Sequence, residues 1–232
     1  MSLTPITPRP NKSNSALLLV DIQNDFLPPL GALAISNADR ILSTVYDLLA
    51  PKFEFKLVVA FQDYHPPGHI SFATTHNLSP FTEIWSQENQ SKIQIWPDHC
   101  VQGTKGCELE SGIQNRLNKL KDLGREIKIF HKGNEVFKEN YSAFTENDDY
   151  HLNNYLKSLG ISNLFCVGLA ADYCVKSTVE FSLKLGYRVL WVSSGIAAVG
   201  GTEAQKQIET KFLKENSNFE LIDLEGIKRI LM

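Results

Sequence analysis

Short apolar runs alternate along this chain with longer segments in which apolar residues recur at helical spacing. Continuous apolar runs bounded by turn residues are typical of strands that are buried on both faces of a sheet. A parallel strand is reached from its neighbour through a crossover, which is usually a helix. The alternation therefore predicts a three-layer α/β/α fold in which helices cover both faces of a central, mostly parallel, Rossmann-like sheet.

The expected strands are Ala16–Val20, Leu57–Phe61, Ile127–Phe130, Leu164–Val167, Val189–Val192 and Phe219–Ile222. The expected helices are about Asp39–Leu49, Gly112–Leu120, Asn147–Leu159, Cys174–Leu185 and Glu203–Asn216. The region from Pro66 to Ser111 is rich in Gln, Ser, Pro and Gly, and we expect it to be irregular. Long loops in compact domains tend to carry function, so this one is expected to form part of a site.

With 232 residues the chain can bury the core of one α/β domain, which we place at 16–232 after a flexible leader at 1–15. The leader is rich in Pro, Ser and Asn and lacks the apolar core of a secretory signal. No apolar run approaches the ~20 residues of a membrane span. The sequence thus predicts a cytoplasmic protein without a membrane anchor. Its net charge of −3 gives no reason to expect a nucleic-acid partner.

Three chemically distinctive residues stand where predicted strands end. Asp21 closes the first strand, Lys132 follows Ile127–Phe130, and Cys174 begins the helix after Leu164–Val167. Alone, each has an ordinary explanation, as a turn residue, a solvated edge or a packed apolar side chain. Together they predict a site, because the carboxyl ends of parallel strands meet at one edge of the sheet.

The three residue types form a coherent catalytic set. A thiol at a helix N-terminus, beside a cation, is expected to favour its thiolate, and the backbone N–H groups there could hold an oxyanion. A carboxylate can take the thiol proton and later pass it to a leaving amine. Asp21, Lys132 and Cys174 are therefore the predicted base, cation and nucleophile.

A second group of residues has the composition of a metal site. Asp63 and His65 are two apart, so in an extended segment they point the same way, and His99 follows further on. One carboxylate and two imidazoles suit a divalent ion such as zinc, iron or manganese. Spacing alone leaves His69 and His76 open as alternatives. Cys100 is disfavoured, since adjacent residues of a strand face opposite ways.

These motifs make the chain, from about residue 16 to 198, resemble the nicotinamidase/pyrazinamidase branch of the isochorismatase-like cysteine hydrolases. The resemblance rests on Val20–Phe26, Asp63–Pro66 with Ser71–Ala73, Trp96–Val101, Lys132–Gly133 and Gly168–Val175. Tyr64 and Ala171 depart from the usual tryptophan and threonine, at positions without a proposed catalytic group.

The resemblance implies specific roles for the residues that match. It makes Asp21, Lys132 and Cys174 the catalytic triad and places an oxyanion hole at the backbone of Ala170 and Cys174. It further implies a single divalent ion, with zinc favoured over iron or manganese, and a cis peptide at Leu169–Ala170. The implied metal ligands are Asp63, His65 and His99, and the implied aromatic pocket is Phe26, Trp96 and Tyr141.

The expected activity is hydrolysis of nicotinamide, and also of pyrazinamide, through a cysteine thioester, as a step in NAD salvage. Plain isochorismatases generally lack the nucleophilic cysteine and the metal residues, and this chain has both. A hydrolase of another carboxamide or carbamoyl group stays open, as does a metal-dependent regulatory protein with a redox-active Cys174. The sequence leaves a homo-oligomer possible.

Overall fold

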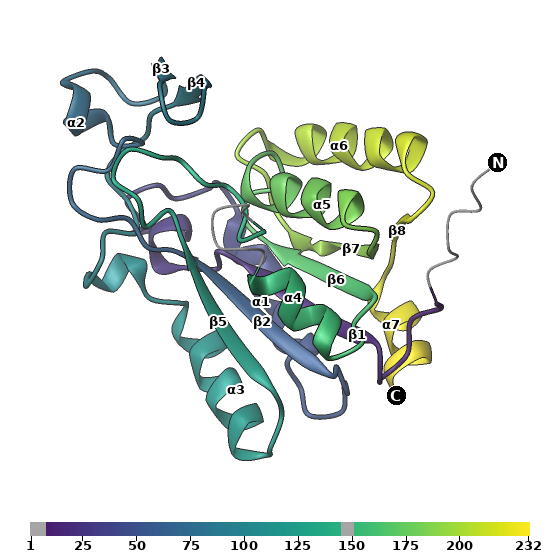
Figure 1. The fold of residues 1–232 in the computed structure, drawn as a ribbon. Coiled ribbons are helices and arrows are strands. Elements are labelled where there is room, and N and C mark those ends of the chain that lie inside the picture. The colour runs from purple at the N-terminus through teal and green to yellow at the C-terminus, as the bar shows by residue number, and fades with distance from the viewer. Residues whose placement is uncertain (1–7, 145–150) are drawn as a thin grey trace.

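The computed structural model describes residues 8–144 and 151–232. These residues form a six-stranded sheet in the order β5-β2-β1-β6-β7-β8, with a two-stranded sheet of β3 and β4 beside it (Figure 1). Every neighbouring pair in the larger sheet is parallel. The predicted α/β fold with a mostly parallel sheet is therefore confirmed.

The strands of the larger sheet are β1 Ser15–Val20, β2 Leu57–Asp63, β5 Ile127–Lys132, β6 Asn163–Gly168, β7 Arg188–Ile196 and β8 Phe219–Leu221. The larger helices are α1 Leu42–Leu48, α3 Ser111–Asp122, α4 His151–Ser158, α5 Cys174–Lys184, α6 Gly201–Glu215 and α7 Leu224–Leu231. All six predicted strands are confirmed, and the helix expected over Asp39–Leu49 consists of a 3₁₀ turn, Ala38–Ile41, followed by α1. The first residues of the helix expected at Asn147–Leu159 lie outside the described residues, and its remainder is α4.

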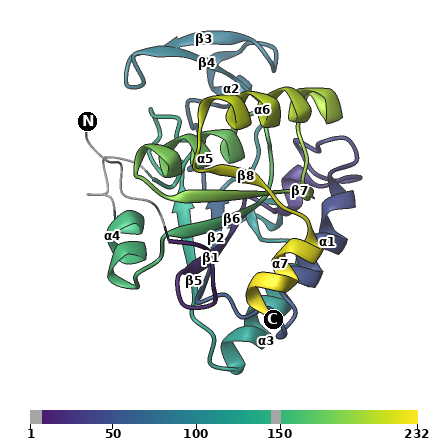
Figure 2. The ribbon, with the colours of Figure 1, turned by 90° about the vertical axis from the view of Figure 1, so that its right-hand side faces the viewer.

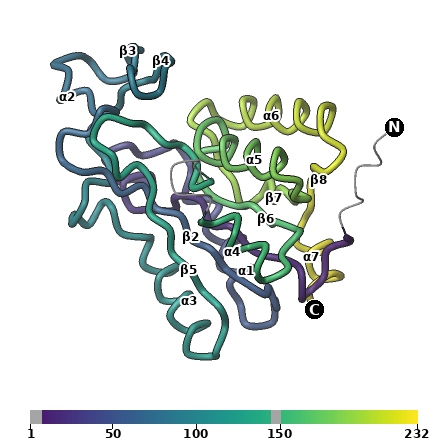
Figure 3. Tube along the Cα trace, viewed as in Figure 1, coloured from purple at the N-terminus to yellow at the C-terminus, as the bar shows by residue number. Residues whose placement is uncertain are grey.

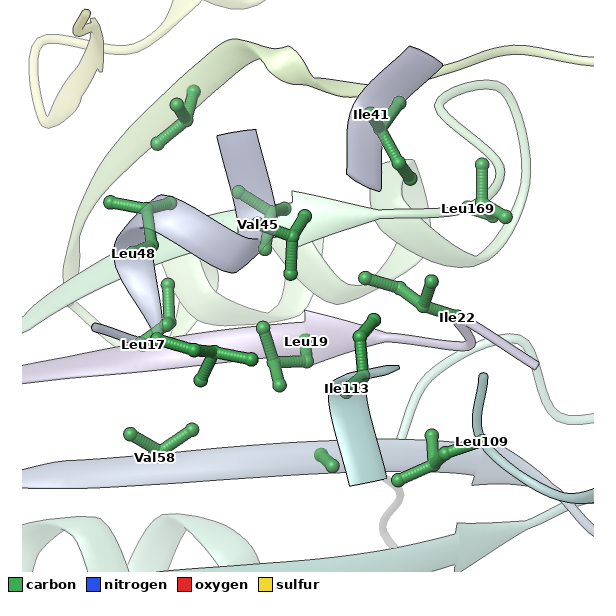
Figure 4. Packing of buried hydrophobic residues seen from close by; sticks show 14 of the residues in the cluster. Leu17, Leu19, Ile22, Ile41, Val45, Leu48, Val58, Leu109, Ile113 and Leu169 are labelled. Atoms are coloured by element: carbon green, nitrogen blue, oxygen red, sulfur yellow. The ribbon is translucent and has the colours of Figure 1, made fainter. Parts of the chain in front are cut away.

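Alternate residues of each strand pack into two separate cores. Leu17 and Leu19 of β1 belong to the core under α1, α3 and α7, which Figure 4 shows from close by. Leu18 and Val20 belong to the opposite core, under α4, α5 and α6. Figure 2 shows α4 and α5 on one side of the sheet and α1 and α7 on the other. Burial on both faces explains why the strands read as continuous apolar runs.

The expectation of an irregular region from Pro66 to Ser111 is wrong in part. Figure 3 traces this excursion from β2 through the short helix α2 and the hairpin of β3 and β4 to α3. The elements within it are α2 Ala73–His76, β3 Glu83–Ser86, β4 Ser91–Gln94 and a 3₁₀ turn at Lys105–Cys107. The hairpin strands are only four residues long and largely exposed, and their turn contains no glycine, so the usual hairpin signals are missing.

Two further expectations concern the ends of the chain. Residues 1–7 of the predicted leader lie outside the described residues, and Ser15, its last predicted residue, begins β1. Helix α7 was not predicted, although Asp223 caps it by accepting a hydrogen bond from Gly226 N–H at 2.7 Å. Within the described part of the chain, no helix combines the length and the apolar character needed to cross a membrane.

Candidate active site

The predicted triad comes together at the carboxyl edge of the sheet. Asp21 directly follows β1, Lys132 is the last residue of β5, and Cys174 is the first residue of α5. Asp63, the last residue of β2, lies between them because β2 separates β5 from β1. All four side chains are buried. Parallel strands that start in register thus deliver these groups from distant parts of the sequence to one point.

Lys132 is the centre of this group. Its Nζ lies 2.9 Å from Asp21 Oδ2, 2.5 Å from Asp63 Oδ1 and 3.3 Å from Cys174 Sγ. Burial opposes the charge of the ammonium, but the two carboxylates outweigh that effect and raise the pKa of Lys132 well above its usual value. The lysine therefore stays a cation and can stabilise negative charge on Asp21 or on the sulfur.

The sequence predicted that Cys174 would favour its thiolate form, whereas the pKa values of Cys174 and Asp21 in the structure favour the thiol. Burial raises the pKa of Asp21 to about 7, although Lys132 acts in the opposite direction. Burial also raises the pKa of the Cys174 thiol well above its usual value, and Lys132 only partly offsets this. The expectation that a helix N-terminus would favour thiolate did not include this desolvation. The resting thiol keeps its proton and faces a carboxyl group that titrates near neutral pH.

A glycine turn sets the position of Cys174, the predicted nucleophile. Gly168 has φ of +130°, and a Cβ there would overlap the backbone of Val20 in the neighbouring strand. The Leu169–Ala170 peptide is cis, as the resemblance implied. The carbonyl of Ala170 then accepts hydrogen bonds from Tyr173 N–H at 3.0 Å and Val175 N–H at 3.1 Å. This compact turn brings the backbone of Ala170 close to the first residue of α5.

The three predicted metal ligands also converge. Ligand atoms of Asp63, His65 and His99 lie within 4.8 Å of one another, and all three residues are buried. Each imidazole has its Nδ1 at a backbone carbonyl, 2.9 Å from Gly133 O for His65 and 2.8 Å from Pro97 O for His99. If Nδ1 donates its proton to the carbonyl, Nε2 keeps a free lone pair that can bind a metal. Histidines that bind metals in proteins usually make such a bond with their other ring nitrogen.

Protonation and hydrogen bonding both fit a cation at this point. Burial lowers the pKa of His65 to about 3 and that of His99 below its usual value, so both imidazoles are neutral. Burial would raise the pKa of Asp63, but Lys132 and the two histidines hold it below its usual value. His65 Nε2 is buried without a hydrogen-bond partner among the described residues. Two neutral imidazoles and one carboxylate form the donor set that a divalent ion requires.

The alternative ligands are engaged elsewhere. Nδ1 of His69 lies 2.7 Å from Ser71 Oγ, and its Nε2 lies 3.1 Å from the carbonyl of Lys138. Nε2 of His76 lies 2.7 Å from the carbonyl of Ile70. Asp21, Asp63 and Cys174 form a second close group, but the ammonium of Lys132 already contacts all three.

A pocket of about 410 Å³ opens beside the sulfur of Cys174. The predicted pocket residues Phe26, Trp96 and Tyr141 all line it. The rest of its lining is Leu33, Ile35, Asp63, His99, Glu139, Ala170, Tyr173, Cys174 and Val199. Its wall is thus mainly apolar and aromatic, and the predicted nucleophile and two of the proposed metal ligands are among the lining residues.

The sequence reasoning missed Glu139 and Tyr173 as pocket residues. Glu139 is buried, and desolvation raises its pKa to about 8. It stands two residues before Tyr141, so in an extended segment both face the same side, and this spacing could have pointed to it. The ring of Tyr173 packs edge-on against Trp96 with centroids 4.8 Å apart. Its hydroxyl donates to Gln94 Oε1 at 2.7 Å, which ties the hairpin to the nucleophile turn.

Comparison with known proteins gives a consistent result. The model of the isochorismatase domain family matches residues 15–218. A nicotinamidase of Escherichia coli strain K12 is 37% identical over 188 residues, which cover 79% of this chain and 83% of that protein.

Solved structures agree with the sequence comparison. The yeast nicotinamidase bound to the inhibitor nicotinaldehyde superposes with a TM-score of 0.78 at 28% identity, covering 90% of this chain and 99% of that one. A pyrazinamidase of Pyrococcus horikoshii in complex with zinc gives a TM-score of 0.68 at 26% identity, covering 91% and 99%.

Proposed function

The chain belongs to the isochorismatase domain family, and we propose that it is a nicotinamidase, an amidohydrolase that converts nicotinamide to nicotinate and ammonia. The observation that carries the proposal is the position of Lys132 Nζ, 2.9 Å from Asp21 Oδ2 and 3.3 Å from Cys174 Sγ, next to a three-ligand group at Asp63. The nicotinate released would enter NAD salvage.

The first half of the reaction forms a thioester. Asp21 takes the proton of the Cys174 thiol, and the sulfur attacks the amide carbon while Lys132 stabilises the negative charge. The resulting oxyanion accepts hydrogen bonds from the backbone N–H groups of Ala170 and Cys174. The C–N bond then breaks, and Asp21 returns its proton to the nitrogen, which leaves as ammonia. A pKa of about 7 suits Asp21 to both transfers.

The second half regenerates the thiol. Water attacks the thioester carbon and gives one proton to Asp21. The C–S bond breaks, the sulfur recovers its proton from Asp21, and the carboxylic acid that forms gives its remaining proton to solvent and leaves as nicotinate. Because the same carboxyl group serves both halves, its substitution is expected to block the reaction at the first step.

The residues Asp63, His65 and His99 would hold a divalent ion, with zinc the favoured metal. When bound, such an ion supplies a Lewis acid that can take the ring nitrogen of the substrate as a ligand. The rings of Trp96, Tyr141 and Phe26 line the same pocket and would hold a flat heteroaromatic ring over the sulfur. Pyrazinamide also carries a ring nitrogen and is expected to be a substrate.

The test is release of ammonia from nicotinamide by the purified chain. Wild type should release it, and Cys174→Ala should not, while both retain the same thermal unfolding midpoint within a few degrees. Benzamide, which has the same shape without a ring nitrogen, should be hydrolysed far more slowly than nicotinamide. Equal kcat/KM for the two amides would rule out anchoring through the ring nitrogen, and strong preference for another carboxamide would replace the substrate.

A further inference from the structure

Asp25 makes hydrogen bonds to two different walls of the site, although it lies outside the pocket. Its Oδ2 accepts from Cys100 N–H at 2.8 Å, and its Oδ1 accepts from Ala32 N–H at 3.2 Å. Its backbone carbonyl accepts from Leu33 N–H at 2.9 Å. One residue therefore links the loop of residues 97–101 to the segment of residues 31–35.

The loop of residues 97–101 carries the proposed metal ligand His99. Cys100, the next residue, has a φ of +48°, a conformation that non-glycine residues rarely adopt. The Asp25 carboxylate accepts a hydrogen bond from the Cys100 N–H. This bond stabilises the unusual conformation of Cys100 and fixes the orientation of the peptide that joins it to His99. The ring of Phe26, which follows Asp25, contacts the His99 ring with centroids 5.5 Å apart.

The segment of residues 31–35 forms another part of the pocket wall. Leu33 and Ile35 line the pocket, and their N–H groups donate to the carbonyls of Asp25 and Phe26, respectively. The bond from Ala32 to the Asp25 side chain fixes the start of this segment. The segment of the apolar wall and the loop of the proposed metal ligand are thus both bonded to Asp25, through its backbone carbonyl and its carboxylate.

The surrounding glycines leave room for Asp25. A Cβ on Gly106 would overlap the Asp25 carboxylate, and a Cβ on Gly31 would overlap its backbone carbonyl. Asn24, next to Asp25, donates to the carbonyl of Lys105 at 2.7 Å, which keeps the turn with Gly106 in place. Gly106 therefore packs directly against the Asp25 carboxylate. The two carboxylate oxygens accept from the N–H groups of Cys100 and Ala32.

We propose that Asp25 is a positioning residue that orients the proposed metal ligand His99 through the backbone of Cys100 and, with its second oxygen, holds Ala32 just before the pocket residue Leu33. The inference rests on the proposed function, because it assumes that His99 binds a metal. Removing partners that orient metal ligands typically weakens binding by 10–100-fold. Asp25→Ala is expected to do the same, and Asp25→Asn to have a smaller effect, because an amide has one acceptor oxygen for the two N–H groups.

Zinc affinity tests this directly. The full chain is stripped of metal and titrated with zinc in competition with a chromophoric chelator, at a temperature well below unfolding. Asp25→Ala should weaken zinc binding about 10–100-fold. Gly106→Ala, which displaces the carboxylate by steric overlap, should weaken it in the same direction. Activity with saturating zinc should recover most of kcat, whereas KM should stay raised, because Ala32, which directly precedes the pocket residue Leu33, loses its bond to the carboxylate.

A double variant separates positioning from general destabilisation. If Asp25 acts through His99, then Asp25→Ala should cause no further loss of zinc affinity in a His99→Ala background. Glu110→Ala is the matched control, since this carboxylate also accepts two backbone N–H bonds, from Gly112 and Ile113 at 2.9 Å each, at the start of α3. It should lower stability without changing zinc affinity.

The outcomes are distinct. Unchanged affinity in both Asp25→Ala and Gly106→Ala, additive losses in the double variant, or an equal loss in Glu110→Ala would each overturn the role of Asp25. If Asp25→Ala does not fold, Asp25→Asn and Gly106→Ala still decide. Failure of the unsubstituted chain to bind zinc would overturn the proposed metal site and this inference with it. Normal zinc binding by that chain with no effect of the substitutions would overturn the inference alone.

Discussion

At the scale of single residues, the charges on Asp21 and Lys132 act on the Cys174 thiol in opposite directions. Asp21 raises the pKa of the sulfur, and Lys132 lowers it. The proposed mechanism nevertheless needs both, because the carboxylate must take the proton that the ammonium helps to remove. Thiol titration and turnover should therefore respond differently to substitution at these positions.

Asp21→Asn is expected to reduce kcat at least ~100-fold, since general acid–base groups typically contribute that much. The same change should move the pH midpoint of Cys174 alkylation downward, because a negative charge beside the sulfur is lost. Lys132→Met should also reduce turnover but move that midpoint upward. Alkylation rates measured between pH 6 and 10 check both directions, and a shift of the same sign in the two variants would contradict this electrostatic account.

Glu139 provides a prediction about pH and stability. Its folded-state pKa of about 8 is raised from 4.5, so the folded protein holds a proton that the unfolded chain releases in between. The stability that this proton provides is fully present below pH 4.5 and is lost as pH rises towards 8. Glu139→Gln should therefore gain stability relative to wild type as pH rises from 5 to 8, by roughly a few kcal/mol.

Chemical denaturation of metal-free protein at several pH values measures this difference. Gln keeps the size and a hydrogen-bonding capacity of the neutral carboxyl group, so the two proteins should be most alike near pH 5. A constant difference between wild type and Glu139→Gln across the range would show that Glu139 titrates normally.

Residues at strand ends could be predicted from the pattern of the strands alone, whereas the loop residues His99, Trp96 and Tyr141 needed the family resemblance and others were missed. Asp21, Lys132 and Asp63 follow apolar runs whose pairing order is strongly limited by the parallel fold. Asp25 acts through contacts with segments distant in sequence, and no periodic pattern encodes these contacts. For Glu139 the only signal is its two-residue spacing from Tyr141. The raised pKa of Cys174 was missed for a related reason, because desolvation depends on the packing of the whole site.

At the scale of elements, the same contrast separates the sheet from the hairpin. Strands β1 and β6 are buried along their full length, and their continuous apolar runs predict them from the sequence. Strands β3 and β4 are mostly exposed, and even Trp85 of β3 is 57% exposed. Composition alone therefore does not mark these segments as strands. Helix α7 does carry a capping residue and apolar spacing, and it could have been predicted.

The link between α5 and α6 leads to a prediction at this scale. Asp172, in the nucleophile turn, accepts hydrogen bonds from Val199 N–H at 3.0 Å and Gly200 N–H at 2.8 Å, just before α6. Val199 lines the pocket. Asp172→Ala should lower the free energy of unfolding by about 0.5–1.5 kcal/mol, because water can replace the carboxylate at these exposed N–H groups, and raise KM for nicotinamide several-fold.

Asp223→Ala is the control for that experiment. It removes the cap of α7, which also uses a carboxylate and a backbone N–H, but no residue of α7 lines the pocket. It should lower stability by about 0.5–2 kcal/mol and leave KM unchanged. An unchanged KM in Asp172→Ala, or an equal rise in Asp223→Ala, would mean that the loop at Val199 does not shape substrate binding.

At the scale of the whole molecule, the proposed metal ligands come from two segments that lie far apart in the sequence and side by side in the fold. Asp63 is the last residue of β2, His65 follows two residues later, and His99 comes from the loop that returns from the hairpin towards α3. An ion at these residues would cross-link the excursion to the sheet. Metal binding should therefore stabilise the chain as well as support its activity.

Zinc added to metal-free protein at about 100 times its dissociation constant should contribute about 2.7 kcal/mol to stability. For a chain of this length that corresponds to a rise in Tm of roughly 5–10 °C. His65→Ala and His99→Ala should each lose most of this rise, whereas His76→Ala, whose Nε2 lies against the carbonyl of Ile70, should keep it. Thermal unfolding with and without zinc, together with the metal content of each purified variant, makes the comparison. A full rise in both His65→Ala and His99→Ala would place the ion elsewhere in the chain, because a three-ligand site that loses one imidazole cannot keep the same affinity.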